Sequence, residues 1–383
     1  MKKVGMVSLG CAKNRVDSEV ILGTLKEAGY EIVSDPAEAE IIFVNTCGFI
    51  EPAKEESIEA IFEMAKYKET GRLQKLFVTG CLAQRYIDDL YREMPEVDGF
   101  MGVADYTRLL EMMQEAEAGK RPRYVCDGER FFQSERVLTT PAYSAYVKIS
   151  DGCDNRCSYC AIPLIRGPYH SRPFDSIVEE CRELAARGVT EITLIAQDTS
   201  RYGIDLYGEY SLAKLMRRLC KIDGLKWLRV LYCYPDALTD ELLETMAEEE
   251  KIVKYIDLPL QHASARVLKR MNRTGDRESL TALMKKIREK IPGVTLRTTL
   301  ITGFPGETEE EFTELAEFVK DIEFERLGCF VYSQEEGTPA ALMPDQIDDE
   351  VKNHRAEIIM ESQMNIMDRL GEKQVGRDIT VLT

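Results

Sequence analysis

Short apolar runs alternate with amphipathic segments along most of this chain, and that alternation limits the folds it can adopt. In residues 1–117 the apolar runs, expected to be strands, are 3–10, 39–46 and 75–80. The amphipathic segments, expected to be helices, are 17–28, 52–66 and 82–94. Such βαβ alternation predicts an α/β domain with a doubly wound parallel sheet covered by helices on both faces. No Gly-x-Gly-x-x-Gly follows these strands, so a dinucleotide fingerprint is absent.

The alternation breaks down in the polar stretch 118–140, which we expect to be a linker. It then resumes, and six further strands are expected at 146–150, 191–196, 227–232, 255–260, 294–301 and 327–333. Six strands are too few for an eight-unit barrel but suit an open, partial (βα)6 barrel, with its site at the carboxyl ends of the strands. The predicted parts of the chain are 1–117, the linker 118–140, 141–340 and 341–383. The last part is expected to hold a helix at 347–371 and the beginning of a strand at 374–383.

Composition limits the environment and the partners. No apolar run reaches the length of about eighteen residues that a transmembrane helix needs. The N-terminal MKKVGMVSLGC meets the charged KNRVDSE without a cleavage site, so it reads as a strand rather than a signal peptide, and we expect a cytoplasmic protein that does not enter a membrane. The net charge of −17 disfavours a partner bound through phosphates and suits a basic protein. Eleven cysteines are too few for a disulfide scaffold, and clustered cytoplasmic thiols are more often metal ligands or catalytic groups.

Three cysteines lie in one loop after the strand expected at 146–150. Cys153, Cys157 and Cys160 have the spacing Cys-x3-Cys-x2-Cys. Thiolates this close can each bind a different iron of a 4Fe–4S cube. No fourth cysteine is nearby, so one iron would keep the open position that a catalytic metal centre needs. The alternatives are a zinc loop that lacks its fourth ligand and a chance cluster of buried cysteines, although zinc sites favour paired Cys-x2-Cys units.

Together with the aromatic Tyr159 before the last cysteine, this loop resembles the signature of the radical-SAM superfamily. The resemblance implies that the open iron chelates the methionine amino and carboxylate groups of S-adenosylmethionine. Electron transfer would then release a deoxyadenosyl radical that abstracts hydrogen from an unreactive carbon. It also implies a partial (βα)6 barrel, in agreement with the six expected strands.

Three more cysteines each follow an expected strand of the N-terminal domain: Cys11, Cys47 and Cys81. The carboxyl ends of such strands share one edge of a sheet, so the three thiols are expected to converge. Each has a glycine neighbour that allows a tight turn or the close approach of a bulky ligand, namely Gly10, Gly48 and Gly80. Converging thiolates suggest a second, auxiliary cluster with an open iron. The alternative is three unrelated buried cysteines.

The motifs SLGCAKNRVDSE, NTCGFIEPAKEES and TGCLAQRY resemble the N-terminal domain of the methylthiotransferases, a branch of the radical-SAM superfamily. The similarity extends along the chain through DGCDNRCSYCAIPLIRGPYHSRP and TTLITGFPGETEEEF. Within the family, GCAKNRVDSE and the flanks ISDGC and AIPLIRG are most similar to the enzymes that methylthiolate an aspartate β-carbon in ribosomal protein S-twelve. The acidic balance also suits that basic substrate. The alternatives are a methylthiotransferase acting on isopentenyladenosine in tRNA and a non-catalytic iron–sulfur electron carrier.

This resemblance implies two 4Fe–4S clusters and two molecules of S-adenosylmethionine. The auxiliary cluster would bind or supply the sulfur, one S-adenosylmethionine would methylate that sulfur, and the radical from the second would remove hydrogen from the aspartate. The partners implied are ribosomal protein S-twelve on or near the small subunit, an electron donor such as flavodoxin or ferredoxin, and a sulfur source. The family normally continues into a C-terminal TRAM β-barrel, which we expect to be missing or truncated here.

The residues expected to bind S-adenosylmethionine are Tyr159, Gln197, Asp198, Arg297, Gly303 and Gly306. The resemblance places Gln197 and Asp198 near the methionine moiety, and Arg297 offers a fork for its carboxylate. The glycines would let the adenosine approach the backbone. The alternative roles are a polar cap at a strand end, an ion pair and an ordinary βα turn. No catalytic residue is expected beyond the cluster ligands. The structural interpretation is preferred for the other cysteines, Cys126, Cys181, Cys220, Cys233 and Cys329, and for a hydrogen-bonded His262.

Overall fold

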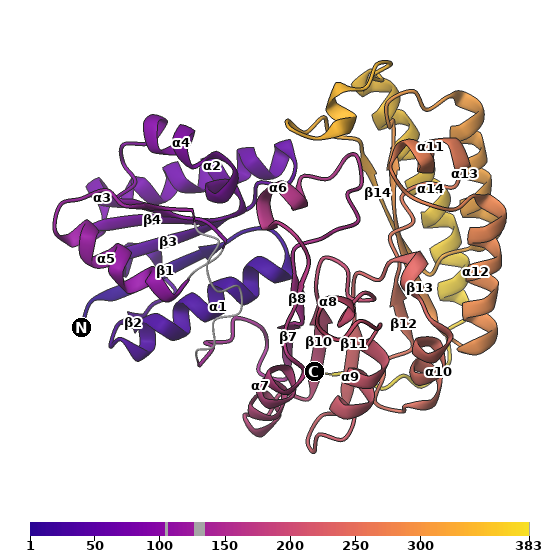
Figure 1. The fold of residues 1–383 in the computed structure, drawn as a ribbon, viewed down its shortest axis with the longest axis horizontal. Helices are drawn as coiled ribbons and strands as arrows, with labels where there is room; N and C mark the ends of the chain where they lie inside the picture. Colours follow the sequence, from indigo (N-terminus) through magenta and orange to yellow (C-terminus); the bar gives the residue numbers. More distant parts are fainter. Residues whose placement is uncertain (104–105, 126–134, 383) are drawn as a thin grey trace. The chain divides into compact units, whose positions relative to one another are not determined.

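The computed structural model describes residues 1–103, 106–125 and 135–382 of the chain. These residues form two compact units (Figure 1). Unit 1 comprises Met1–Pro141 and the short segment Ala161–Pro168, and unit 2 comprises Ala142–Cys160 and Tyr169–Thr383. Cys126, one of the cysteines interpreted as structural, lies outside the described residues. Within the described part of the chain, no helix has the length and apolar character needed to cross a membrane.

Unit 1 contains the expected doubly wound parallel sheet, with six strands in the order β2-β1-β3-β4-β5-β6. Every pair of neighbouring strands is parallel. The strands are β1 (Lys3–Ser8), β2 (Glu31–Ile32), β3 (Ile41–Thr46), β4 (Lys75–Gly80), β5 (Gly99–Met101) and β6 (Arg123–Tyr124). The helices are α1 (Ala12–Glu27), α2 (Glu51–Ala65), α3 (Tyr67–Thr70), α4 (Cys81–Glu93), α5 (Leu109–Glu117) and α6 (Ile162–Arg166). Two 3-10 turns are η1 (Pro36–Glu38) and η2 (Tyr106–Arg108).

Helices cover both faces of this sheet (Figure 1). Ile42 and Val44 of β3 point into a core formed with α2 and α4. Ile41 and Phe43 point the other way, into a core formed with α1 and α5, where Phe43 stacks on Phe77 at 4.9 Å. All six residues of β3 are buried, as expected for a strand covered on both sides.

The stretch 118–140 is not a linker throughout. Arg123 and Tyr124 form β6 and pair in parallel with Phe100 and Met101 of β5. A strand of two polar residues at a sheet edge has no apolar run to mark it, which is why the sequence did not reveal it. Unit 1 accordingly continues to Pro141.

Unit 2 contains six parallel strands in two sheets, with the orders β11-β10-β7 and β12-β13-β14. They are β7 (Ser144–Lys148), β10 (Glu191–Ile195), β11 (Trp227–Val230), β12 (Tyr255–Asp257), β13 (Thr295–Thr302) and β14 (Arg326–Val331). A parallel bridge from Leu228 to Ile252 joins the two sheets beside β11 and β12. The strands therefore follow one another in chain order, as in the expected partial (βα)6 barrel. The short strands β8 (Ser150–Asp151) and β9 (His170–Ser171) pair antiparallel beside them.

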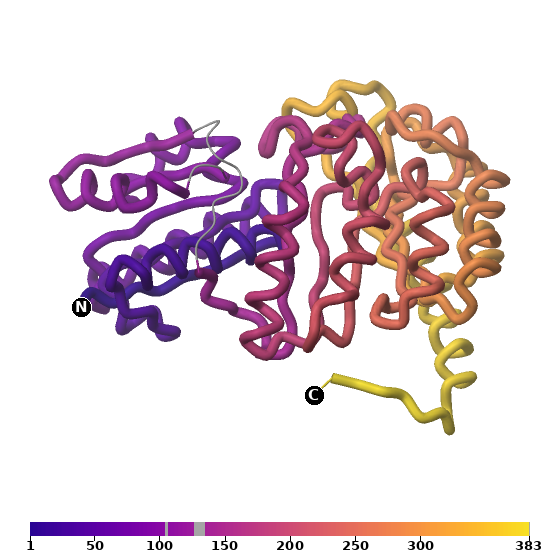
Figure 2. The backbone as a smooth tube through the Cα atoms, turned by 60° about the horizontal axis from the view of Figure 1, so that its bottom comes forward, coloured from indigo at the N-terminus to yellow at the C-terminus, as the bar shows by residue number. Residues whose placement is uncertain are grey.

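The helices of unit 2 lie along the outside of these strands (Figure 2). They are α7 (Phe174–Ala186), α8 (Ile204–Tyr207), α9 (Leu212–Leu219), α10 (Asp240–Glu248), α11 (Ala265–Arg270), α12 (Arg277–Lys290), α13 (Glu309–Ile322) and α14 (Asp349–Glu372), with the 3-10 turns η3 (Pro235–Ala237) and η4 (Pro339–Leu342). Capping boxes at Asp276 and Thr308 begin α12 and α13. The prediction that a strand begins at residue 374 was wrong for the described residues 374–382, which contain no strand.

Candidate iron–sulfur and S-adenosylmethionine sites

The thiols of Cys11, Cys47 and Cys81 converge at one edge of the unit 1 sheet. They follow β1, β3 and β4, which are adjacent in the sheet. A Cβ added at Gly10 would lie 2.9 Å from Cβ and 3.2 Å from Sγ of Cys47. A Cβ at Gly48 would lie 3.0 Å from the carbonyl carbon of Cys81. The glycines therefore allow the cysteine-bearing turns to pack against each other.

Asn14 holds these turns together from the first turn of α1. Its Nδ2 donates to the carbonyl oxygens of Leu9, at 3.2 Å, and Thr46, at 2.9 Å. Its Oδ1 accepts from the Cys81 thiol at 3.4 Å. Sequence reasoning missed this residue. The sequence does hold a signal for it, because the polar residues Asn14, Asp17 and Ser18 share one face of the helix at helical spacing. All three are buried.

A buried guanidinium also lies at this edge. Arg166 ends α6, and its Nη2 lies 2.8 Å from Oδ1 of Asn14, 2.9 Å from Oδ2 of Asp17 and 3.7 Å from Sγ of Cys81. All of these residues belong to unit 1. Only 3% of Arg166 and 2% of Asp17 is exposed, so their interaction is little screened by water.

The three thiols differ in how readily they ionise. Burial raises the pKa of Cys81 to about 11 and also raises that of Cys47, with Arg166 acting against burial at both. Burial opposes ionisation of Cys11 as well. There, however, Lys13, Arg166 and backbone N–H groups at the N-terminus of α1 lower the pKa overall.

This donor set fits an iron–sulfur cluster. The described cysteines are all free of disulfides, so the thiols are available. Within the ranges that the structure describes, no three Cys, His, Asp or Glu side chains form a group that would hold one metal ion. In a 4Fe–4S cube each thiolate binds a different iron, so its cysteines need not share one metal ion. Cations and a helix N-terminus favour the thiolate form that binds iron.

The second set, Cys153, Cys157 and Cys160, lies in the loop after β8, and all three are partly exposed. The loop is closed by a turn in which Cys160 N donates to Cys157 O at 3.0 Å. The end of α11 fastens it from outside. Ser158 Oγ donates to Arg270 O at 2.8 Å, and Asn272 Nδ2 donates to Arg156 O at 3.0 Å. These hydrogen bonds fix the shape of the loop.

Arg273 places a buried positive charge beside this loop. Its Nη1 lies 3.7 Å from Sγ of Cys157 and 3.5 Å from the Tyr159 hydroxyl, and its Nη2 donates to Pro259 O at 2.6 Å. The guanidinium stacks 4.2 Å from the centre of the Tyr234 ring. A buried cation offsets the charge of nearby thiolates, so these residues also fit a cluster. Sequence reasoning missed Arg273, because nothing near it in sequence marks it as part of the loop.

Of the expected S-adenosylmethionine ligands, Gln197 and Asp198 lie against the cluster loop. The carboxylate of Asp198 is buried and accepts from Asn155 Nδ2 at 2.8 Å and from Ser200 Oγ at 2.6 Å. Gln197 Nε2 donates to Asp151 Oδ1 at 3.1 Å. Its Oε1 is buried and has no hydrogen-bond partner in the described part of the protein, so it can accept a donor from a ligand.

The other expected ligands have internal partners. Arg297 pairs with the buried Asp257 at 2.8 Å, while its own side chain is 37% exposed. The burial of Tyr159 raises its pKa well above the usual range, so the phenol stays neutral beside Arg273. A Cβ at Gly303 would clash with the Lys352 side chain, and one at Gly306 with the Arg270 guanidinium. With φ near +70° at both glycines, these contacts account for the turn without a ligand.

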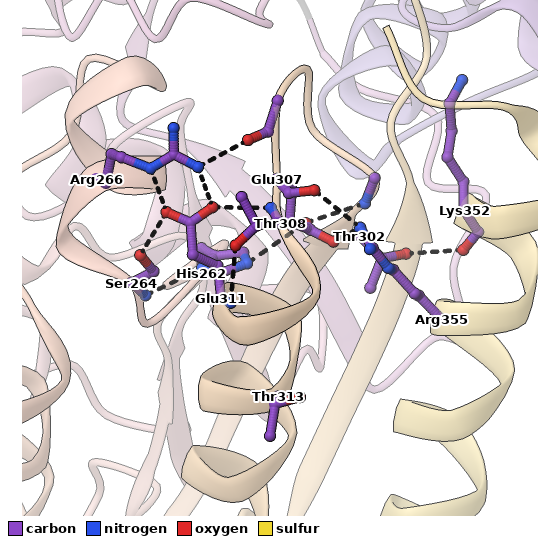
Figure 3. Close-up of polar contacts among 12 residues, drawn as sticks. His262, Ser264, Arg266, Thr302, Glu307, Thr308, Glu311, Thr313, Lys352 and Arg355 are labelled. Atoms are coloured by element: carbon purple, nitrogen blue, oxygen red, sulfur yellow. Dashed lines mark hydrogen bonds and ion pairs between the residues drawn. The ribbon is translucent and has the colours of Figure 1, made fainter. Parts of the chain in front are cut away.

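His262 is fully buried in a polar network behind that turn (Figure 3). Its Nδ1 accepts from Ser264 N at 3.0 Å, and its Nε2 lies 3.4 Å from Oε2 of Glu307. Glu307 also accepts from Gly303 N at 3.1 Å and pairs with Arg355 of α14 at 2.7 Å. The network ties the turn after β13 to α14, in agreement with the structural interpretation of His262.

The remaining described cysteines are buried or half-buried and lie outside the two cysteine sets. Cys181, Cys220 and Cys233 are buried, and Cys329 is half-buried on β14. Burial raises the pKa of Cys233 and of Cys329 to about 12. Such thiols stay protonated and unreactive, which agrees with structural roles.

Comparison with known proteins covers both units. Residues 147–319 match the model of the Radical SAM superfamily, and residues 3–102 match that of the Uncharacterized protein family UPF0004. The "Ribosomal protein uS12 methylthiotransferase RimO" of Desulforamulus reducens is 50% identical over 385 residues, which cover 100% of this chain and 87% of that protein. The protein of the same name from Clostridium botulinum strain Hall is 51% identical over 99% of this chain and 86% of its own. The chain belongs to this methylthiotransferase family. It is a radical-SAM enzyme, as the cysteine motifs predicted, and uS12 is the current name of ribosomal protein S-twelve.

A solved structure supports the fold independently. The radical S-adenosylmethionine methyltransferase TsrM from Kitasatospora setae superposes with a TM-score of 0.64 over 89% of this chain and 74% of its own. At 16% identity, that likeness shows the radical-SAM fold alone.

Proposed function

We propose that this enzyme transfers a methylthio group to the β-carbon of an aspartate in ribosomal protein uS12. It would use two 4Fe–4S clusters and two molecules of S-adenosylmethionine. The observation that carries the proposal is the convergence of Cys11, Cys47 and Cys81 at one sheet edge, in addition to the loop of Cys153, Cys157 and Cys160. A plain radical generator needs only the loop. The substrate follows from relatives of about half identical sequence that carry the uS12 name.

In this proposal, the loop cysteines hold the radical cluster, and the three cysteines of unit 1 hold the auxiliary cluster. When bound, the clusters and S-adenosylmethionine supply the radical that removes hydrogen and the sulfur that replaces it. A C–H bond next to a carboxylate is only very weakly acidic, and a radical removes its hydrogen without a base. The chain's own contribution is therefore to hold, orient and electrostatically balance these groups.

Three residues at the radical site have distinct proposed roles. The Oε1 of Gln197 suits a ligand ammonium group, because it is a buried acceptor for which the described residues supply no donor. The exposed part of the Arg297 guanidinium suits a carboxylate, while Asp257 fixes its other side. Asp198 acts through Asn155, which lies between Cys153 and Cys157 in the loop.

Tyr159, Gly303 and Gly306 have supporting roles in this proposal. Tyr159 is an uncharged neighbour of the Arg273 cation. The glycines keep the turn after β13 narrow, because a side chain there would clash with Lys352 or Arg270. Gly303 is buried, so in this proposal the partly exposed Gly306 is the glycine whose backbone an adenosine approaches.

The test is an anaerobic reaction of the reconstituted enzyme with S-adenosylmethionine, a sulfide source and a flavodoxin- or ferredoxin-type reductant. Purified uS12 and unmodified tRNA are supplied in parallel. We expect deoxyadenosine and a methylthio mass increase on one aspartate of uS12. Modified tRNA with unchanged uS12 would overturn the substrate. Absence of deoxyadenosine from a protein carrying its full iron content would contradict the radical reaction itself.

A further inference from the structure

The segment that follows the radical-cluster loop belongs to the unit that holds the other cysteines. Ala161–Pro168 is part of unit 1, although the residues on either side of it belong to unit 2. Ala161 and Ile165 pack with Val103 and Cys81 in a small apolar cluster. This packing fixes α6 so that its last residue, Arg166, is buried next to the Cys81 sulfur.

One nitrogen of Arg166 lies close to three neighbouring groups that differ in charge. Nη2 is within hydrogen-bond distance of the neutral Asn14 amide and the anionic Asp17 carboxylate, and it points a donor at the sulfur of Cys81. Arg166 is thus a buried cation beside the Cys81 sulfur, and Asp17 is the anion that partly offsets it.

We propose that Arg166 is a positioning residue that tunes the auxiliary cluster by donating to its sulfur, with Asp17 limiting the strength of that effect. The inference rests on the proposed function, because it requires a cluster on Cys11, Cys47 and Cys81. Once the thiols bind iron as thiolates, they no longer donate hydrogen bonds. The Arg166 N–H groups then remain as charged donors to sulfur at Cys81.

The two residues act on the cluster with opposite sign. Reduction adds negative charge to a cluster, and a nearby cation or a hydrogen bond to sulfur stabilises the reduced form. R166Q removes the cation and should make the reduction potential more negative. D17N removes the opposing anion while preserving shape, and it should make the potential more positive. A purely structural role for the pair gives no reason for opposite shifts.

The experiment uses the full chain with the three loop cysteines changed to alanine, so that the auxiliary cluster is observed alone. The reference protein is compared with its R166Q, R166K, D17N and D17N/R166Q derivatives. Each is reconstituted with iron and sulfide, its iron is counted, and its midpoint potential is measured by redox titration followed by electron paramagnetic resonance. We expect a negative shift for R166Q, a smaller one for R166K, a positive shift for D17N and an intermediate value for the double variant.

The outcomes separate the inference from the proposal beneath it. If the reference protein holds no cluster, the auxiliary site fails and the inference fails with it. If the cluster is present but R166Q and D17N shift its potential in the same direction, or not at all, only the inference is overturned. Should R166Q not fold, D17N decides alone, because the inference requires its shift to be positive.

Discussion

The two cysteine sets use the same element, a buried arginine nitrogen 3.7 Å from one cysteine sulfur, in opposite structural settings. In the radical loop, Cys157 faces Arg273, and all three cysteines lie in one short loop. At the sheet edge, Cys81 faces Arg166, and the three cysteines come from distant parts of the sequence. The loop is held by its own turn, by the end of α11 and by Asp198, which accepts from Asn155. The sheet-edge cysteines come together only when β1, β3 and β4 pair in this register.

The surroundings of the two arginines differ as well. Arg166 contacts the carboxylate of Asp17, so its positive charge is partly neutralised. Arg273 is surrounded by the Tyr159 hydroxyl, the Tyr234 ring and the Pro259 carbonyl. The hydroxyl and the carbonyl accept its hydrogen bonds and the ring stacks on it, and none of the three carries a negative charge that would cancel its own. The comparison indicates that the sheet-edge set depends on long-range packing and on a balanced ion pair, whereas the loop depends on local hydrogen bonds and an unbalanced cation.

The largest expected effect separates the sets by function. C153A should abolish formation of deoxyadenosine, whereas C81A should retain it and lose only methylthio transfer. Each variant should lose about four irons, which is one 4Fe–4S cube. Two cysteine ligands are not enough to hold a cube that normally has three. Product analysis by mass spectrometry and iron determination check both. Loss of deoxyadenosine formation in C81A, with the radical cluster still present, would show that the two sets do not work separately.

The next effect concerns the stability of the protein without clusters. R166Q leaves the buried Asp17 carboxylate without its guanidinium, and breaking a buried pair in this way costs about 3–5 kcal/mol. R273Q leaves mainly the Pro259 carbonyl without a donor, which costs about 1–3 kcal/mol. Urea unfolding followed by circular dichroism measures both. If R273Q lowered the free energy of unfolding as much as R166Q or more, the contrast between the two arginines would be contradicted.

A smaller and more local effect is expected at Gly10. Alanine there requires an unfavourable backbone at φ +82° and places Cβ against Cys47. Gly29 is the matched control, because it lies in the same unit at φ +88° with no atom within 4 Å of an added Cβ. Both substitutions cost about 1–2 kcal/mol of backbone strain. Only G10A should lower the iron bound by the sheet-edge cysteines. Equal iron loss in G29A would attribute the effect to strain alone.

The sequence predicted much of this architecture because the apolar runs of the strands and the amphipathic pattern of the helices were both clear. The strands β1, β3 and β4 and the six strands of unit 2 were expected close to their observed positions, and with them the convergence of Cys11, Cys47 and Cys81. It did not predict β6, which has no apolar run. Nor did it predict Arg166 or Arg273, because each acts on a cysteine through a contact that only the folded chain creates. The binding role expected for Gly303 and Gly306 stays a prediction, and the nearest neighbours of an added Cβ at either glycine are protein side chains.

The smallest effect tests the part of the radical site where sequence and structure suggest different roles. The sequence suggested that Asp198 contacts S-adenosylmethionine directly, whereas its carboxylate holds Asn155 of the cluster loop. Removing that hydrogen bond with N155A costs about 0.5–1.5 kcal/mol, or up to about tenfold in affinity for S-adenosylmethionine. If Asp198 acts through Asn155, D198A added to N155A should weaken binding less than the two single effects summed. Calorimetric titration of the four proteins measures this coupling. Additive effects, with D198A much the larger, would instead support direct contact between Asp198 and the ligand.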